Sequence, residues 1–172
     1  AEMARPTLKV GLITVIISFV LVGITGDVIG KVMTEQQPMK MAAAEALYET
    51  TESAPFSILT VGTLDGSRPV FQLDIPTVLS FLATGDFGAT VEGVNDLEAA
   101  YDLKYGPGDY TPNIPLAYWS FRLMIGFGAI AFFLAIFTLW RIRKGGGLPS
   151  SKWFLRSMIA MPLIPLAAIS FG

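Results

Sequence analysis

Residues 10–26 read VGLITVIISFVLVGITG, a run of seventeen residues without a charged side chain. Two further uncharged runs lie at 123–140 and 157–172. About 20 apolar residues cross a hydrocarbon core roughly 30 Å thick, so each run with its apolar neighbours is long enough for a membrane helix. The whole chain is 52% hydrophobic and 15% charged, with a mean hydropathy of +0.57. These values exclude an ordinary soluble domain and predict an integral membrane protein.

The charged residues are distributed unevenly and indicate an orientation. Segment 31–116 holds four basic and twelve acidic residues, a net charge of −8, whereas the whole chain carries −2. Basic residues flank the apolar runs on the other side: Arg5, Lys9, Arg141, Arg143, Lys144 and Lys152. Because basic loops stay in the cytoplasm, we expect these flanks to be cytoplasmic and the acidic segment to be extracytoplasmic.

The predicted fold class is an all-α membrane protein, a helical bundle with one long extracytoplasmic loop. Pro162 and Pro165 predict a kink in the last helix. That helix reaches Gly172 without a polar tail, so we expect it to be truncated and the chain to be a piece of a longer polypeptide. The expected organisation is a cytoplasmic stub at 1–7, a transmembrane helix at 8–26, the loop at 27–116, a second transmembrane helix at 117–140, a cytoplasmic turn at 141–152 and a third transmembrane helix at 153–172.

The loop is too long to be a plain connector, and its apolar content predicts a compact, docked segment. Residues 38–52 are rich in helix-forming residues after an initial proline, so we predict a helix there. Two strand-like runs at 56–63 and 70–73, joined by turn residues at 64–67, predict a small hairpin. Short helices are expected at 76–83 and 94–103.

Lys40 and Glu45 are the first candidate site residues. Five positions correspond to roughly 140° of helix rotation, so the two side chains can flank a groove without sharing one stripe. A carboxylate can accept a proton from a substrate hydroxyl, and an ammonium can donate a hydrogen bond to its oxygen. The alternative is a solvated amphipathic helix with Met41, Ala44 and Leu47 packed inward and the charged residues in water: Lys40, Glu45, Glu49 and Glu52.

Asp27 follows the first apolar run directly. If the membrane helix ends at Gly26, Asp27 faces the negative end of the helix dipole, which would suit a proton acceptor or relay. The alternative is that Gly26 ends the helix as a C-terminal cap and Asp27 lies in water.

Arg122 and Met124 form the second constellation, at the start of the second membrane helix. The chain has no histidine and no cysteine. Methionine is therefore its softest candidate ligand for iron, and any metal or heme site must take further ligands from elsewhere. The alternatives are an arginine that extends to the interface and a methionine that fills a gap in the packing.

Two sequence elements resemble subunit I of the cytochrome bd quinol oxidases over essentially the whole chain. Gly26-Asp27-Val28-Ile29-Gly30 is similar to the element that ends a membrane helix in this family, and Gln37-Pro38-Met39-Lys40-Met41-Ala42-Ala43-Ala44-Glu45 resembles the opening of its quinol loop. Phe121-Arg122-Leu123-Met124 resembles the family element that supplies a heme ligand.

The resemblance implies roles for these residues. Lys40 and Glu45 correspond to the quinol-site lysine and glutamate, and Asp27 to the aspartate at the membrane edge. Met124 corresponds to the methionine ligand of a low-spin heme b, with Arg122 beside it and a histidine from elsewhere as the opposite ligand. The loop resembles the short form found in this family.

The resemblance also implies a respiratory, oxygen-reducing quinol oxidase that is incomplete on its own. A second heme b and a heme d are expected elsewhere in the complex. Expected partners are quinol, the lipid bilayer, the rest of subunit I, subunit II and, as a further candidate, a small single-helix subunit, with no nucleic acid. The expected location is the plasma (inner) membrane of a bacterium or archaeon. The alternative function is a non-catalytic membrane protein or transporter fragment whose outer loop binds a partner.

Overall fold

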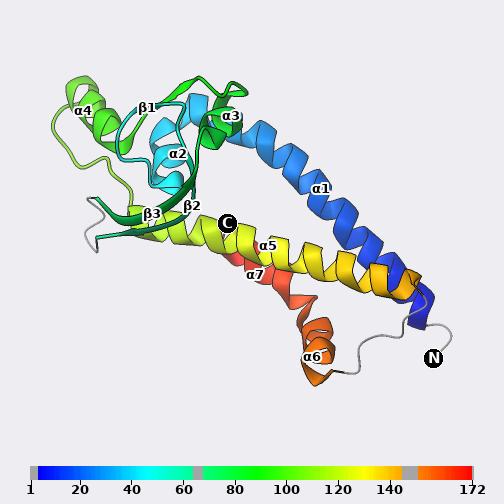
Figure 1. Cartoon of the computed structure of the whole chain (residues 1–172). Coiled ribbons are helices and arrows are strands. Elements are labelled where there is room, and N and C mark those ends of the chain that lie inside the picture. Colours follow the sequence, from blue (N-terminus) through cyan, green and yellow to red (C-terminus); the bar gives the residue numbers. More distant parts are fainter. Residues whose placement is uncertain (1–3, 64–67, 145–150, 172) are drawn as a thin grey trace. The chain divides into compact units, whose positions relative to one another are not determined.

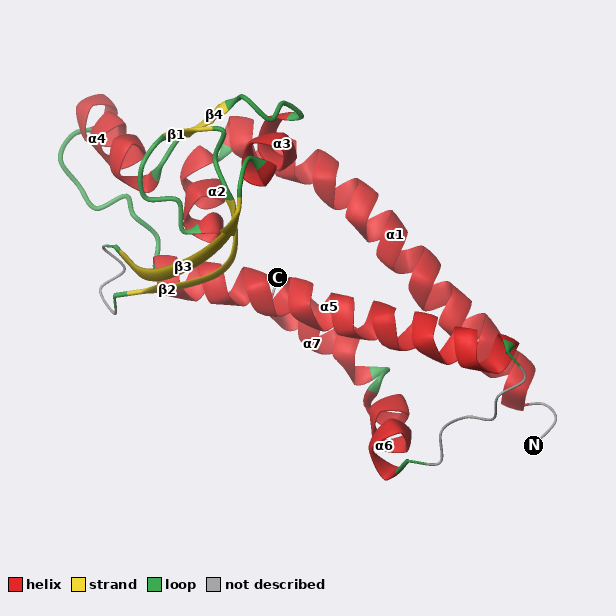
Figure 2. Ribbon diagram, viewed as in Figure 1, coloured by secondary structure: helices red, strands yellow, loops and turns green. Residues whose placement is uncertain are grey.

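The computed structural model describes residues 4–63, 68–144 and 151–171. The chain divides into two compact units, one of residues 1–24 and 120–172 and the other of residues 25–119. We call these the membrane unit and the loop unit and describe each by itself (Figures 1 and 2). The predicted turn at 64–67 and most of the glycine-rich turn within 141–152 lie outside the described residues.

The long apolar helices agree with the predicted fold class. Helix α1 (Ala4–Gln36) and helix α5 (Ile114–Arg143) are long and apolar enough to cross a membrane. The last predicted span is a bent pair, α6 (Lys152–Ala160) and α7 (Leu163–Phe171), with 55° between the two helices. The break falls at Met161 and Pro162, because a proline has no N–H to continue the helical hydrogen bonds. The predicted kink is confirmed.

Small and aromatic side chains bring the helices of the membrane unit together. Leu12 of α1, Ala135 of α5 and the buried Met161 form one cluster. Phe19 stacks on Phe132 with 4.4 Å between ring centroids. A Cβ atom on Gly128 would lie 3.3 Å from the Phe19 ring, so the glycine allows the close approach. This use of small residues is typical of helix packing in membranes.

Helix α1 is longer than the predicted span of 8–26. It continues to Gln36, because Gly26 does not stop it and the apolar residues Val28, Ile29 and Val32 follow. Asp27 therefore lies inside a helix and not at its C-terminus, so the dipole argument made for this residue is wrong.

The loop unit contains short helices and two small antiparallel sheets. The predicted hairpin is confirmed, since Thr60 pairs with Gln72 and Phe56 with Ile75. Two short strands far apart in sequence also pair, with Thr51 opposite Val91, which the sequence pattern did not predict. The elements are α2 (Pro38–Glu45), β1 (Thr51–Glu52), β2 (Phe56–Gly62), β3 (Pro69–Ile75), α3 (Val78–Thr84), β4 (Thr90–Val91) and α4 (Val94–Tyr105).

Helix α2 lies at the centre of the loop unit. One stripe of α2, made of Met39, Ala42 and Ala43, packs into a cluster of buried residues together with Ala46 just beyond the helix. The other members of this cluster include Val94, Leu97, Ile114 and Tyr118. Met41, with Leu47 just beyond the helix, packs into a second cluster of buried residues: Ala54, Leu79, Ala83 and Val91. Burial on two sides explains why this helix consists largely of small and apolar residues.

The predicted helix 38–52 is too long, because α2 ends at Glu45. Ala46 takes a left-handed conformation with φ of 51°, and the amide of Leu47 donates to the Ala42 carbonyl at 2.9 Å. This is a Schellman-like end. The Leu47 and Tyr48 carbonyls then accept hydrogen bonds from the first amides of α4. These tertiary bonds outweigh the local helix propensity of the segment.

Candidate functional site in the loop unit

Helix α2 places the two predicted site residues in different environments. Lys40 is exposed, whereas Glu45 at the last turn of the helix is only 3% exposed. Glu49 and Glu52 are exposed, so the solvated alternative holds for them and is wrong for Glu45. Glutamate is rarely this buried in proteins unless it is paired or functional. Glu45 is therefore the most informative charged residue of the loop unit.

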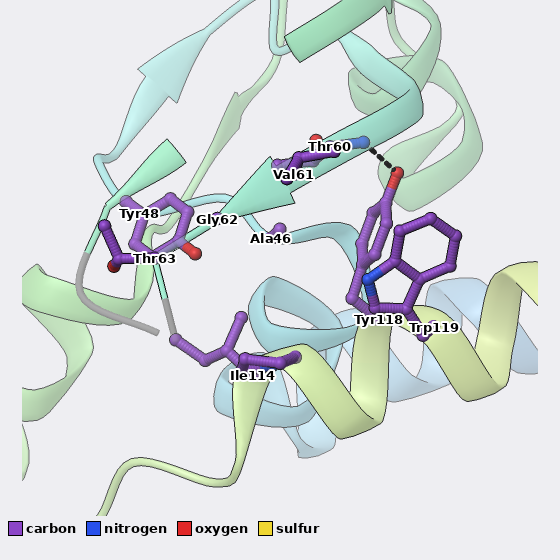
Figure 3. Close-up of a pocket in the computed structure, with 10 residues that line it drawn as sticks. Ala46, Tyr48, Thr60, Val61, Gly62, Thr63, Ile114, Tyr118 and Trp119 are labelled. Atoms are coloured by element: carbon purple, nitrogen blue, oxygen red, sulfur yellow. Dashed lines mark hydrogen bonds between the residues drawn. The ribbon is translucent and has the colours of Figure 1, made fainter. Parts of the chain in front are cut away.

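A pocket begins at the residue after Glu45. Its volume is about 220 Å³, and Ala46 and Tyr48 line it together with the end of β2 and the start of α5. Figure 3 shows Tyr48 on one side and the Tyr118 and Trp119 rings on the other, with Ala46 between them. The volume lies below the roughly 300–1,000 Å³ typical of sites for whole ligands. The pocket is thus large enough for a ring and not for a long tail.

A buried hydrogen-bond network holds one wall of this pocket. The Thr60 amide donates to the Tyr118 hydroxyl at 2.6 Å, and Ser57 Oγ lies 2.9 Å from the same hydroxyl. Ser57 Oγ is also 2.5 Å from Thr60 Oγ1. Buried hydroxyls are costly unless they are satisfied, so this network fixes the start of α5 against β2.

Asp27 forms an ion pair that the sequence analysis missed. Its carboxylate lies 2.7 Å from the Lys31 ammonium, one turn further along α1, and both side chains are about one-third exposed, at 37% and 36%. The spacing of four residues was a sufficient signal for this pair. A Cβ atom on Gly85 would lie 4.0 Å from Lys31 Nζ, so the ammonium lies close to the C-terminal end of α3, whose dipole is negative.

Arg122 and Met124 lie on α5 in the membrane unit, whereas Lys40, Glu45 and Asp27 belong to the loop unit. Both are half-buried. Met124 is four residues before Gly128 and seven before Ala131, which places it on the helix stripe that packs against α1. The Arg122 guanidinium lies 5.5 Å from the centroid of the Phe121 ring.

Residues 1–172 match the family of cytochrome bd terminal oxidase subunit I. The chain belongs to this family. It is 35% identical over 170 residues to cytochrome bd ubiquinol oxidase subunit 1 of Bacillus subtilis (strain 168), which covers 98% of this chain and 36% of the relative. It is 29% identical over 154 residues to a putative cytochrome bd menaquinol oxidase subunit I of the same organism, which covers 88% of this chain and 32% of that relative.

The fold of the chain also resembles a solved member of the cytochrome bd group. The structure of bd oxidase from Geobacillus thermodenitrificans matches with a TM-score of 0.79 at 28% identity, covering 98% of this chain and 36% of that chain. This subunit I chain thus spans about a third of the length of the relatives it matches. The family match does not favour the transporter alternative.

A cytochrome implies heme, and the donor atoms of this chain fit only part of such a site. Within the described ranges no group of three or more His, Cys, Asp or Glu residues could hold a metal ion. The chain has no histidine or cysteine, but the Met124 thioether is a known type of axial ligand for heme iron. A heme at this chain could therefore be held by the Met124 thioether, and the sequence supplies no imidazole or thiolate to join it.

Proposed function

We propose that this chain contributes the quinol-oxidising loop of a terminal respiratory oxidase that reduces oxygen. Membership of the subunit I family and the names of the relatives support this function. The observation that carries the proposal is Glu45, a carboxylate only 3% exposed that directly precedes a residue of the pocket wall. Neither Glu45 nor Lys40 is among the residues that line the pocket. A buried acidic side chain one residue along the chain from a ring-sized pocket suits a proton acceptor.

The proposed chemistry assigns a role to each charged residue of α2. Oxidation of a quinol to a quinone releases two electrons and two protons. Glu45 accepts one of these protons as a general base, and Lys40, exposed on the same helix, donates a hydrogen bond to a quinol oxygen. Asp27, held by Lys31, is proposed as the next proton carrier. The pocket of about 220 Å³ takes the quinol ring and leaves its tail outside.

Met124 and Arg122 are the proposed residues for the electron acceptor. A low-spin heme b, when bound, takes up one electron at a time. Met124 would hold the heme iron through its thioether, and a neutral sulfur donor raises the heme potential. Arg122 would contribute a positive charge near a propionate. The second heme b and the heme d are proposed to lie in parts of the complex beyond this chain, with subunit II and a small subunit as partners.

The proposed location is a bacterial plasma membrane with the loop unit on the extracytoplasmic side. The net charge of −8 on segment 31–116, set against basic flanks, supports this orientation. Protons released from quinol would then enter the extracytoplasmic space, and the oxidase would contribute to the proton gradient.

The role of Lys40 is tested by steady-state quinol oxidation with the complete oxidase. Lys40→Met should raise the KM for quinol about tenfold or more, because a charge-assisted hydrogen bond contributes roughly 1.5–3 kcal/mol. The heme content should not change. Lys104→Met, which removes another exposed lysine of the loop unit, is the matched control and should keep the wild-type KM. Wild-type kinetics in Lys40→Met would remove this residue from the site.

A further inference from the structure

Cationic side chains are numerous where α1 and α5 pack together, and α6, which contacts α5, carries two more. The N-terminal part of α1 packs against the C-terminal part of α5, with Leu8 and Ile142 against one shared cluster (Figure 1). Met158 of α6 packs against the same cluster. The basic residues of these segments are Arg5, Lys9, Arg141, Arg143, Lys144, Lys152 and Arg156.

These cations have no acidic side chains to balance them within the membrane unit. Outside residues 25–119 the sequence contains a single acidic residue, Glu2, and the described residues of the membrane unit contain none. Mutual repulsion of the cations is therefore unrelieved by any carboxylate that the structure describes in this unit. An anion from outside the chain would relieve it.

Arg141 is the residue that indicates where such an anion would bind. Its Nε atom is buried and makes no hydrogen bond with any described residue. Arg141 follows Phe137 and Thr138 by one turn, and these two contact α6: Phe137 lies 6.2 Å from Phe154 between ring centroids, and Thr138 Oγ1 lies 3.6 Å from Met158 Sδ. Arg141 thus occupies the face of α5 toward α6.

Helix-dipole stabilisation does not account for this arrangement. Basic residues in the last turn of α5 gain about 0.3–1 kcal/mol from the dipole, but the dipole gives a buried N–H no acceptor. A buried donor without an acceptor costs about 1–3 kcal/mol. An external acceptor at Arg141 removes this cost.

The aromatic neighbours indicate that this end lies at a membrane surface. Lys144 Nζ is 4.5 Å from the centroid of the Trp140 ring, and the Arg156 guanidinium is 5.7 Å from that of Trp153. Tryptophan gathers at the level of the lipid headgroups, and clusters of Lys and Arg beside membrane helices attract anionic lipids. Phe133 and Phe137, which precede Arg141 in α5, have exposed apolar side chains, and acyl chains would lie there.

We propose that the basic end of the membrane unit is a binding site for the phosphate of an anionic phospholipid, with Arg141 as the central contact. The guanidinium donates to the phosphate oxygens in the fork geometry that arginine favours. Lys144, three residues after Arg141, adds charge at the rim. This site is independent of the quinol site in the loop unit.

The test uses the complete oxidase, freed of lipid in detergent and titrated with phosphatidylglycerol or phosphatidylcholine. Native mass spectrometry measures the bound lipid. Phosphatidylglycerol should bind the wild type more tightly than phosphatidylcholine, and Arg141→Gln should weaken it about tenfold, the equivalent of roughly 1.4 kcal/mol. Arg143→Gln removes an equal charge from an exposed position and is the matched control, with an expected loss of about twofold.

Three outcomes would overturn the proposal. The first is equal binding of the two lipids. The second is an equal loss of affinity for phosphatidylglycerol in Arg141→Gln and in Arg143→Gln. The third is displacement of phosphatidylglycerol by millimolar inorganic phosphate, which would indicate a site for a soluble anion. If Arg141→Gln does not assemble, Arg141→Lys decides, because it keeps the charge and lacks the Nε–H. The affinity of Arg141→Lys for phosphatidylglycerol should be several-fold lower than that of the wild type. An affinity equal to that of the wild type would count against the site.

Discussion

The hydroxyl of Tyr118 accepts a hydrogen bond of 2.6 Å from the backbone amide of Thr60, which joins the start of α5 to strand β2. Tyr118 is 2% exposed and Thr60 is equally buried. The same two residues line the pocket whose wall includes Ala46, the residue after Glu45. A single phenol therefore holds together the hairpin, the end of the loop and the wall of the proposed quinol site.

Tyr118→Phe should loosen this wall while it keeps the ring. Loss of the hydroxyl leaves the Thr60 amide without its acceptor and Ser57 Oγ with Thr60 Oγ1 alone, at an expected cost of about 1–3 kcal/mol. Hydrogen exchange of the β2 amides in the complete oxidase measures the effect, and exchange at Thr60 should become faster. Tyr110→Phe removes a hydroxyl that bonds the Gly106 carbonyl, and it should leave exchange in β2 unchanged. Unchanged exchange at Thr60 in Tyr118→Phe would show that the bond does not stabilise the hairpin.

Gly93→Ala should destabilise the loop unit. A Cβ atom at this position would lie 2.3 Å from the Glu49 carbonyl carbon and 2.6 Å from the Tyr48 oxygen. The backbone must shift, which endangers the hydrogen bonds from the first turn of α4 to Leu47 and Tyr48. An overpacked site of this kind costs about 1–3 kcal/mol.

Limited proteolysis of the complete oxidase measures this change, and Gly93→Ala should be cleaved in the loop unit faster than the wild type. Gly88→Ala is the control, because its Cβ would meet only Asp86 Oδ1 at an ordinary 3.7 Å. Equal cleavage of the two variants would contradict the predicted clash.

The stability of the loop unit should fall at low pH through Asp96. Hydrogen bonds from the Thr50 side chain and then from its backbone amide hold the pKa of Asp96 below its ordinary value. The ionised carboxylate therefore stabilises the folded loop above the unfolded pKa of about 3.9, and this stabilisation is lost as the pH falls through the lower, folded pKa. Asp96→Asn should flatten this part of the pH profile of proteolytic resistance, and Thr50→Val should flatten it partly. An unchanged profile in Asp96→Asn would assign the acid sensitivity to other groups.

The sequence predicted the elements of the loop more successfully than their ends. The hairpin and the short helices could be predicted from the pattern of apolar residues and from turn residues, which are local signals. The early end of α2 could not, because α4 donates hydrogen bonds to the carbonyls of Leu47 and Tyr48, just after the left-handed Ala46, and the local sequence does not encode these contacts. The burial of Glu45 was likewise missed. It depends on two clusters that meet around α2 and that the local charge pattern does not encode.

The roles of Lys40, Glu45, Asp27, Arg122 and Met124 stay predictions, since they depend on bound groups. The sequence nevertheless contained the signal for Lys31, at four residues from Asp27. The mid-helix position of Asp27 could also have been expected, because nothing between Gly26 and Gln36 disfavours a helix strongly enough to end it.

Met124→Leu tests the proposed heme ligand. The substitution conserves volume and helix propensity and removes the sulfur, so the packing of α5 should change little. The low-spin heme b signal should be lost or shifted, and the potential of any remaining heme should fall. Met158→Leu, which replaces a methionine of α6 in the membrane unit, is the control and should keep the wild-type spectrum. An unshifted low-spin spectrum in Met124→Leu would make Met124 a packing residue.

The central claim is that Glu45 takes a proton from quinol, and rapid mixing of quinol with the oxidised, anaerobic complete oxidase tests it most directly. Glutamine matches the shape of the side chain and cannot act as the base, so Glu45→Gln should slow heme reduction by quinol about 10²-fold or more. Dithionite, which needs no quinol site, should reduce the hemes fully in both proteins. Equal rates of heme reduction by quinol in the wild type and in Glu45→Gln would contradict the account.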